Sequence, residues 1–306
     1  RAELDFLDVK RQSLAVYGQF GESKWIPFAK ENSHHPNRRD SADLGGVGVG
    51  RTLLCVGMGA SLEDQVGIIK KYRDRVDIIT CDKGFAPLLR RGIKPDYVML
   101  CDCNVVWQKW AASEEDTEGV ALIATPYANV TWTRKWRGPI YFYVNRDAID
   151  TQDKFLPIMG PGTRIVPASS NVSNAMLVFF TGMDEWDRKP FGGYEKFLLI
   201  GYDYSWQPGG NYYAWADPKP KRYYMNHRAL VDKKGRLVYS SENLIFSARW
   251  LAQYLQANAG IISVVDCSGG LLNSQSSDLE AALRSINPGK AQAIRAATQA
   301  LEAARK

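Results

Sequence analysis

Residues 52–64 read TLLCVGMGASLED, and this stretch decides the fold class. A short apolar run, residues 52–56, ends at a glycine-rich turn, and an amphipathic segment follows over residues 62–72. A continuous apolar run is typical of a strand buried on both faces, and an amphipathic segment is typical of a helix lying on a sheet. The stretch therefore predicts the first strand–turn–helix unit of a parallel sheet.

The same alternation continues along the chain. Further strands are expected near residues 76–81, 97–101, 120–124, 140–144, 164–166, 197–200 and 261–265. Helices are expected near residues 85–91, 105–112, 173–180, 243–257, 278–285 and 290–305. This order predicts an α/β, Rossmann-like, mostly parallel sheet with helices on both faces, forming a single nucleotide-binding core.

The regions flanking this core differ from it in composition. Residues 1–50 are expected to form an N-terminal extension and linker, because a Pro/Arg stretch and four glycines precede residue 51, as in flexible connectors. Residues 51–272 would form the catalytic domain. Residues 273–306 would form C-terminal helices, the last of them Ala-rich and suited to packing on the body or on a second copy of the chain.

Composition indicates a globular protein and leaves its partner open. The 306 residues are 45% hydrophobic and 24% charged, which excludes wholesale disorder. No apolar run approaches the roughly 18–20 residues that cross a bilayer. The excess of 39 basic over 33 acidic residues gives a net charge of +6, which fits a phosphorylated substrate, a nucleic acid or an ordinary enzyme. Five cysteines without a C-x-x-C pair favour reduced thiols, no zinc site and a cytoplasmic location.

The glycine-rich turn after the first strand is the first candidate binding site. Gly57, Gly59, Ala60 and Ser61 would let a phosphate approach the backbone, and a helix start favours an anion. The third glycine of a dinucleotide fingerprint is missing, and so is the Lys-Ser/Thr pair of a P-loop. A tight strand–helix turn without a ligand is therefore the alternative.

Polar residues follow the other predicted strands. Asp82, Asp102 and Asn104 come directly after the second and third strands, where ligands bind in open α/β sheets. They could hold ribose hydroxyls, whereas helix capping is the alternative, and the Asp102-x-Asn104 pair is too incomplete to assign a metal. Ser169 and Ser170 precede a predicted helix in a Ser/Asn-rich stretch that suits a nucleotide or phosphate contact.

The last candidate segment starts at residues 201–205, GYDYS, and continues through an aromatic stretch to His227. His227 is one of three histidines, and the other two lie in the Pro/Arg stretch. A histidine beyond a strand's carboxyl end is a candidate general base, because its ordinary pKa lies near neutrality.

Four segments together resemble the domain-of-unknown-function 115 superfamily: LLCVGMGASLED, DIITCDKGFAPLLRRGIKPDYVMLCD, SSNVSNAM and KFLLIGYDYSW. The superfamily holds motility-accessory-factor glycosyltransferases and archaeal-type 6-hydroxymethylpterin diphosphokinases, which are MptE-like. The similarity covers roughly residues 51–272.

The second half is also similar to bacterial family 42 sialyltransferases. Residues 201–204 match their Gly-x-Asp-aromatic segment, residues 213–215 approximate a Tyr-Ala-Phe segment, and residues 227–232 match a His-x-x-x-x-Asp segment. This resemblance implies that His227 is the catalytic base, places Asp203 in the catalytic set, and gives donor phosphate contacts to Tyr204 and Tyr213. Ser205 departs from the pattern, because an aromatic residue is expected there.

These resemblances imply an inverting glycosyltransferase that moves a sugar, such as a nonulosonic acid, from a nucleotide-activated donor to an acceptor hydroxyl. The donor would be CMP-linked, the acceptor a glycan or a protein, and no cofactor is firmly implied. One alternative is a diphosphokinase that uses ATP on a pterin-like alcohol, with magnesium on Asp82 and Asp102. Another is a phage-type transferase with a modified DNA base as acceptor, given the basic-aromatic residues 132–137 and 206–228. A binding module that has lost its activity is the third.

The aromatic stretch from residue 202 to residue 239 predicts a lid. Loops longer than roughly 12–15 residues in compact domains are usually functional or disordered, and its tyrosines and tryptophans argue against disorder. A lid that closes over the donor would exclude water and protect an activated sugar. Hydrogen exchange across residues 205–226 should therefore slow when donor or product nucleotide is added. Exchange that is already slow in the free protein, and unchanged by nucleotide, would mark the stretch as fixed scaffold.

Overall fold

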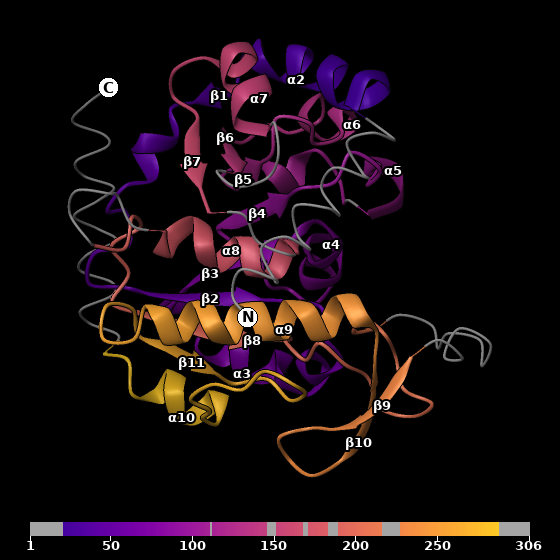
Figure 1. The fold of residues 1–306 in the computed structure, drawn as a ribbon. Helices are drawn as coiled ribbons and strands as arrows, with labels where there is room; N and C mark the ends of the chain where they lie inside the picture. The colour runs from indigo at the N-terminus through magenta and orange to yellow at the C-terminus, as the bar shows by residue number, and fades with distance from the viewer. Residues whose placement is uncertain are drawn as a thin grey trace.

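The computed structural model describes residues 21–110, 112–145, 151–167, 171–182, 189–215 and 227–287. Its centre is a nine-stranded sheet in the order β1-β6-β5-β4-β3-β2-β8-β11, with β7 also paired to β6 (Figure 1). Every pairing in this sheet is parallel. The predicted α/β, Rossmann-like class is confirmed.

The strands are β1 (Arg38–Arg39), β2 (Thr52–Val56), β3 (Asp77–Cys81), β4 (Tyr97–Leu100), β5 (Ala121–Ala124), β6 (Ile140–Asn145), β7 (Arg164–Val166), β8 (Lys196–Ile200), β9 (Arg228–Val231), β10 (Leu237–Ser240) and β11 (Val264–Asp266). The helices are α2 (Ile26–Ser33), α3 (Val66–Lys71), α4 (Asp82–Arg90), α5 (Trp107–Trp110), α6 (Val130–Thr133), α7 (Thr151–Met159), α8 (Val172–Thr181), α9 (Glu242–Ala257) and α10 (Leu279–Arg284). The expected helix over residues 290–305 lies outside the described residues.

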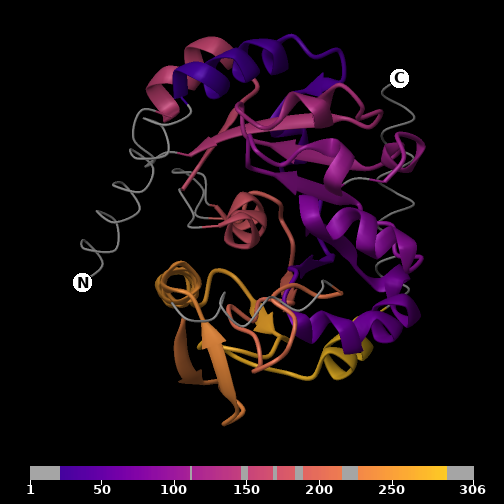
Figure 2. The same ribbon diagram turned by 90° about the vertical axis from the view of Figure 1, so that its right-hand side faces the viewer.

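The central strands are buried on both faces, as their continuous apolar runs predict. Every residue of β2 and β3 is buried. Helices α8 and α9 lie on one side of the sheet, and α3 and α4 lie on the other (Figure 2). Among the described residues, no helix is long and apolar enough to cross a membrane.

Part of the expected N-terminal linker is structured. Residues 38–39 of the expected linker form β1, which pairs with β6, and the hydroxyl of Ser41 donates to the Phe142 carbonyl. Asn32 at the end of α2 donates to the carbonyls of Pro126 and Ala128, so residues 26–41 are integrated into the sheet domain. The division at residue 272 stays a prediction.

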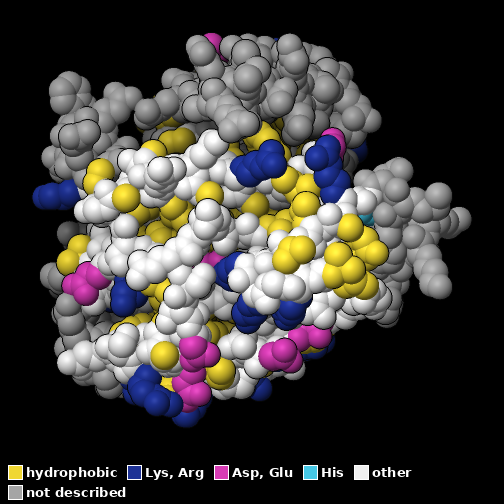
Figure 3. All heavy atoms as spheres, turned by 60° about the horizontal axis from the view of Figure 1, so that its bottom comes forward, with side chains coloured by type: hydrophobic (Ala, Val, Ile, Leu, Met, Phe, Trp, Pro, Cys, Tyr) yellow, Lys and Arg dark blue, Asp and Glu magenta, His cyan; other side chains and the backbone are white. Residues whose placement is uncertain are grey.

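The expected loop from residue 202 to residue 239 was wrong at its end, where β9 and β10 form an antiparallel hairpin. Val231 and Leu237 face each other across this hairpin and are both exposed. Figure 3 shows apolar side chains gathered on this face of the molecule. The alternation signal is weak in this hairpin because six of its eight residues are hydrophobic and follow one another without intervening polar residues.

The strand order reverses between β2 and β8, and this reversal creates the site. From β2 the chain proceeds through β3, β4, β5 and β6 toward one edge, whereas β8 and β11 lie on the other side of β2. The loops that leave β2 and β8 therefore diverge, and ligands bind in the crevice at such a point in open α/β sheets.

Two glycines let these two loops touch. The N–H of Gly57 donates to the Ile200 carbonyl, and the N–H of Gly59 donates to the Gly201 carbonyl, each at 2.8 Å. A Cβ on Gly201 would lie 2.4 Å from the Gly57 carbonyl oxygen, and Gly201 has a φ of +72°. Only glycine satisfies both the conformation and the contact.

We predict that Gly201→Ala destabilises the protein far more than Gly209→Ala. Both glycines have a φ of +72°, but a Cβ on Gly209 would meet no atom within 4 Å. The conformational penalty, about 1–2 kcal/mol, is shared, and the clash at Gly201 adds about 1–3 kcal/mol. Urea unfolding of both variants measures the difference. Equal losses would show that the contact between the two loops carries no stability.

Candidate functional site

A cavity of about 270 Å³ lies at the carboxyl edge of the sheet, over the reversal in strand order. Residues that follow β2, β3, β4 and β8 line it together with the start of α8. The lining residues are Met58, Gly59, Cys81, Asp82, Lys83, Cys101, Asp102, Val105, Asn171, Val172, Ser173, Gly201, Tyr202, Tyr204, Ser205, Tyr212, Tyr213 and Leu244. The predicted site residues Gly59, Asp82, Asp102, Tyr204 and Tyr213 are thus brought together.

Asp82 is the carboxylate buried in this cavity. It begins α4, is 3% exposed, and one of its oxygens accepts the N–H of Lys83 at 2.6 Å. Burial raises the pKa of Asp82 to about 6, and the negative charge of Asp102 adds to the rise. Asp102 lies across from it, exposed, with one oxygen accepting the N–H of Asn104. The cavity therefore contains a carboxyl group that titrates near neutral pH.

Lys83 is a site residue that the sequence did not single out. Its ammonium donates to the Tyr213 hydroxyl at 3.3 Å and lies 5.0 Å from the centroid of that ring. Burial alone would lower the pKa of Lys83, but the nearby Tyr213 and Asp82 outweigh it, so the pKa is raised. The ammonium therefore stays charged inside the cavity wall. The available signal was its position next to Asp82, directly after β3. An Asp-Lys pair is too common in sequences to indicate a binding site by itself.

The glycine-rich turn is hydrogen-bonded to the end of β8 and the loop that follows it. The N–H groups of Gly57 and Gly59 donate to the β8 end, and both the N–H and the hydroxyl of Ser61 donate to the Asp203 carboxylate. Ala60 and Ser61 line a neighbouring cavity of about 460 Å³. These N–H groups already have acceptors, so the geometry gives the turn a structural role, and phosphate binding there stays a prediction.

Asp203 is a buried anchor. It is 5% exposed, and besides Ser61 it accepts the N–H of Gly269 at 3.0 Å. Burial raises the pKa of Asp203, against the lowering effect of these donors. The carboxylate thus ties three loops together, which fits a positioning residue, whereas its predicted catalytic role is untested.

Two tyrosines from the same loop form a fixed wall of the cavity. Tyr204 has a φ of +52°, and its hydroxyl donates to the Asn174 side chain, while the Tyr202 hydroxyl donates to the Ser173 carbonyl. Left-handed backbone is costly for a bulky residue and persists only where surrounding contacts impose it. Both rings are therefore oriented before any ligand arrives.

The remaining predicted residues lie elsewhere. The His227 ring packs edge-on against Trp206, with centroids 4.8 Å apart, and it is absent from the described lining of the cavity. Asn104 is exposed, and its side-chain oxygen accepts a hydrogen bond from the Lys24 ammonium at 2.7 Å. Ser169 and Ser170 lie outside the described residues.

The first part of the predicted lid is attached to the body. The N–H of Ala214 donates to the Met58 carbonyl at 2.8 Å, and the N–H of Trp215 donates to Glu63 at 2.6 Å. Trp206 is buried, and its backbone forms an antiparallel β-bridge with Tyr239. Residues 216–226 lie outside the described residues, so closure of a lid stays a prediction.

Comparison with known proteins gives a fold relative and a family. The solved structure of the MAf glycosyltransferase from Magnetospirillum magneticum AMB-1 is similar, with a TM-score of 0.59 and 17% sequence identity. The likeness covers 89% of this chain and 42% of that protein, and at this identity it shows a shared fold. No curated protein matches the sequence.

The family evidence bears out the predicted superfamily, whereas the sialyltransferase resemblance stays a prediction. The family model for "6-hydroxymethylpterin diphosphokinase MptE-like" matches residues 29–209. That match spans more than half of the sequence, and the chain therefore belongs to the MptE-like family.

Proposed function

We propose that the protein is a glycosyltransferase that moves a sugar from a nucleotide-activated donor to an acceptor hydroxyl. The observation that carries the proposal is Asp82, a carboxylate with a pKa of about 6 inside a tyrosine-walled cavity at the reversal in strand order. A general base works best when its pKa lies near the working pH. The shared fold with a glycosyltransferase supports the same reading.

In this mechanism Asp82 takes the proton from the acceptor hydroxyl. The acceptor oxygen forms a bond to the anomeric carbon as the bond from that carbon to the phosphate oxygen breaks, which inverts the configuration. The electron pair leaves with the nucleotide, and the Lys83 ammonium offsets its charge. Tyr202, Tyr204 and Tyr213 supply aromatic faces and hydroxyl groups for the sugar, which aromatic residues commonly bind. The sialyltransferase resemblance implies His227 as the base in place of Asp82, and the variants described below distinguish the two.

A diphosphokinase is the second candidate, and the family name supports it. Asp82 and Asp102 both line the cavity, and the charge of Asp102 acts on Asp82. Two carboxylates with substrate phosphates are a usual magnesium site, so these residues fit the ion, which would neutralise phosphate charge when bound. Thermal shift with nucleotide sugars, compared with ATP plus magnesium, discriminates the two, since the diphosphokinase responds only to the second.

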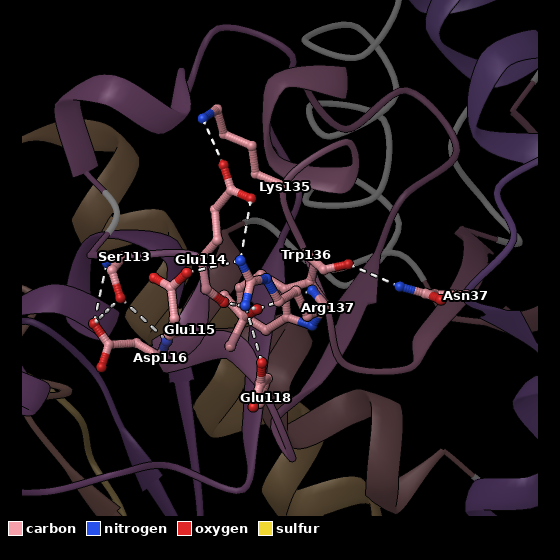
Figure 4. Close-up of polar contacts among 10 residues, drawn as sticks. Asn37, Ser113, Glu114, Glu115, Asp116, Glu118, Lys135, Trp136 and Arg137 are labelled. Atoms are coloured by element: carbon pink, nitrogen blue, oxygen red, sulfur yellow. Dashed lines mark hydrogen bonds and ion pairs between the residues drawn. The ribbon is translucent and has the colours of Figure 1, made fainter.

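The ion pairs of residues 134–137 weaken the argument for DNA as the acceptor. The basic residues among 134–137, which favoured a nucleic acid in the sequence, form ion pairs with glutamates. Figure 4 shows the pairs of Lys135 and Arg137. The pairs are Arg134 with Glu31 (2.6 Å), Lys135 with Glu114 (2.8 Å), and Arg137 with Glu115 (2.7 Å) and Glu118 (3.0 Å). Cations that already have carboxylate partners contribute little attraction for a phosphate backbone.

We predict that Asp82→Asn lowers the transfer rate about 10²- to 10⁴-fold, because the general base is lost. The activity of the unmodified protein should rise with pH and level off above about pH 6, as Asp82 ionises, and the variant should lack this rise. Mass spectrometry of products from a panel of nucleotide sugars measures both.

The matched control is Asp74→Asn, an exposed aspartate before β3, at the opposite end of the strand from Asp82. It should leave the rate unchanged. Full activity of Asp82→Asn together with a large loss in His227→Ala would transfer the base role to His227. No transfer with any nucleotide sugar, and turnover of ATP instead, would select the diphosphokinase.

The same variant should also stabilise the fold at alkaline pH. The pKa of Asp82 rises from 3.8 to about 6 on folding, so stability is full below pH 3.8 and falls as pH rises to about 6. A shift of that size corresponds to at most about 3 kcal/mol. Urea unfolding should therefore show Asp82→Asn gaining stability at pH 8 and little at pH 3.5. A loss of stability at both pH values would mean that the carboxylate supports the fold.

A further inference from the structure

A second cleft, of about 190 Å³, opens beside the cavity and shares Met58, Lys83 and Tyr213 with it. It lies between α4, α5 and the aromatic segment after β8. The residues that line it are Met58, Lys83, Ala86, Pro87, Arg90, Lys109, Trp110, Tyr213, Ala214 and Trp215. Because three residues line both, the cleft and the cavity adjoin each other.

The described lining of the cleft contains three cations and no carboxylate. Arg90, at the end of α4, and Lys109, on α5, are exposed, while Lys83 is half-buried between the cleft and the cavity. The pKa of the neighbouring Arg91 is lowered by burial and then by the positive charge of Arg90. This cationic cluster contrasts with residues 134–137, whose charges are neutralised by glutamates, and it leaves the cleft positive.

The aromatic side chains of the cleft are held in place. The Lys109 ammonium lies 5.3 Å from the Trp110 ring centroid, and the Arg91 guanidinium lies 3.6 Å from that of Trp215. Trp215 has a φ of +59°, and the hydrogen bonds of Ala214 and Trp215 fasten the segment to the body. Fixed aromatic rings beside cations suit a ligand that carries both a ring and an anionic group.

A nucleotide in the cavity needs partners for its phosphate oxygens. The N–H groups of Gly57, Gly59 and Ser61, which such a turn would normally offer, already donate within the protein. Asp82 and Asp102 repel phosphate unless a cation intervenes. Among the described residues that line the cleft, Arg90, Lys109 and Lys83 are the cations that adjoin the cavity.

We propose that the phosphate groups of the nucleotide bind in this cleft, on Arg90, Lys109 and Lys83, and not on the glycine-rich turn. The inference rests on the proposed function for the presence of a nucleotide. The ligand class is a nucleoside mono- or diphosphate, with its ring beside Trp110. The donor then lies across the boundary between the cleft and the cavity, with its sugar next to Asp82.

Isothermal titration calorimetry tests the proposal with CMP, UDP, ADP and inorganic pyrophosphate as probes. The double variant Arg90→Ala/Lys109→Ala should weaken binding of the nucleotide that the unmodified protein prefers by about tenfold or more, since bonds to charged groups are lost. Binding to the unmodified protein should weaken as salt is raised, and the double variant should show a smaller salt effect. Both exchanged side chains are exposed, so the fold should persist, and urea unfolding checks this.

Two single variants serve as matched controls. Lys30→Ala removes an exposed lysine of α2, and Lys234→Ala removes an exposed lysine that lines the 460 Å³ cavity. Neither should change nucleotide affinity. Unchanged affinity in the double variant, or a loss in Lys234→Ala alone, would overturn the cleft as the phosphate site and leave the proposed function standing. If no nucleotide binds and no sugar is transferred, the proposed function fails. Pyrophosphate binding that depends on Arg90 and Lys109 would still support the cleft, and its absence would overturn it.

Discussion

The contact between the loops that leave β2 and β8 is the constraint on which the site depends. The loops that leave the neighbouring strands β2 and β8 lead toward opposite edges of the sheet and must separate, yet here Gly57 and Gly201 bring the two backbones together at the base of the crevice. The Asp203 carboxylate then joins Ser61 to Gly269 over the same point. The floor of the cavity is thus rigid, and its chemistry is left to the residues after β3 and β4.

Burial of Asp82 carries an energetic cost when its carboxyl group is ionised. A carboxylate buried among apolar strand ends is disfavoured as an ion, and the structure offers it one backbone donor and a nearby ammonium instead of a full ion pair. By contrast, Asp203 has three donors from two other loops. The two buried aspartates at this sheet edge therefore have different roles. Asp203 is held by hydrogen bonds to other loops, whereas Asp82 lines the cavity.

Sequence alone predicts the sheet well because its signals are local. The apolar runs of β2, β3, β4, β5, β6 and β8 are long enough to mark strands, and Asp82 and Asp102 follow them directly. The N-terminal strand β1 has only two residues, both arginines, so no pattern reveals it. Lys83, Arg90, Lys109 and Trp215 could not be grouped either, because their proximity depends on how the segment after β8 folds back over Met58. His227 was proposed from a motif match and lies outside the described lining of the cavity, so its role stays a prediction.

Lys83 stands at the boundary of two compartments and belongs to both. Its positive charge lowers the proton affinity of Asp82, since the two groups interact directly. An anion seated against that ammonium from the cleft side would screen it, and the carboxylate would then hold a proton more tightly. By thermodynamic reciprocity, protonation of Asp82 would tighten the hold on the anion. One side chain would thereby couple proton uptake at Asp82 to anion binding in the cleft.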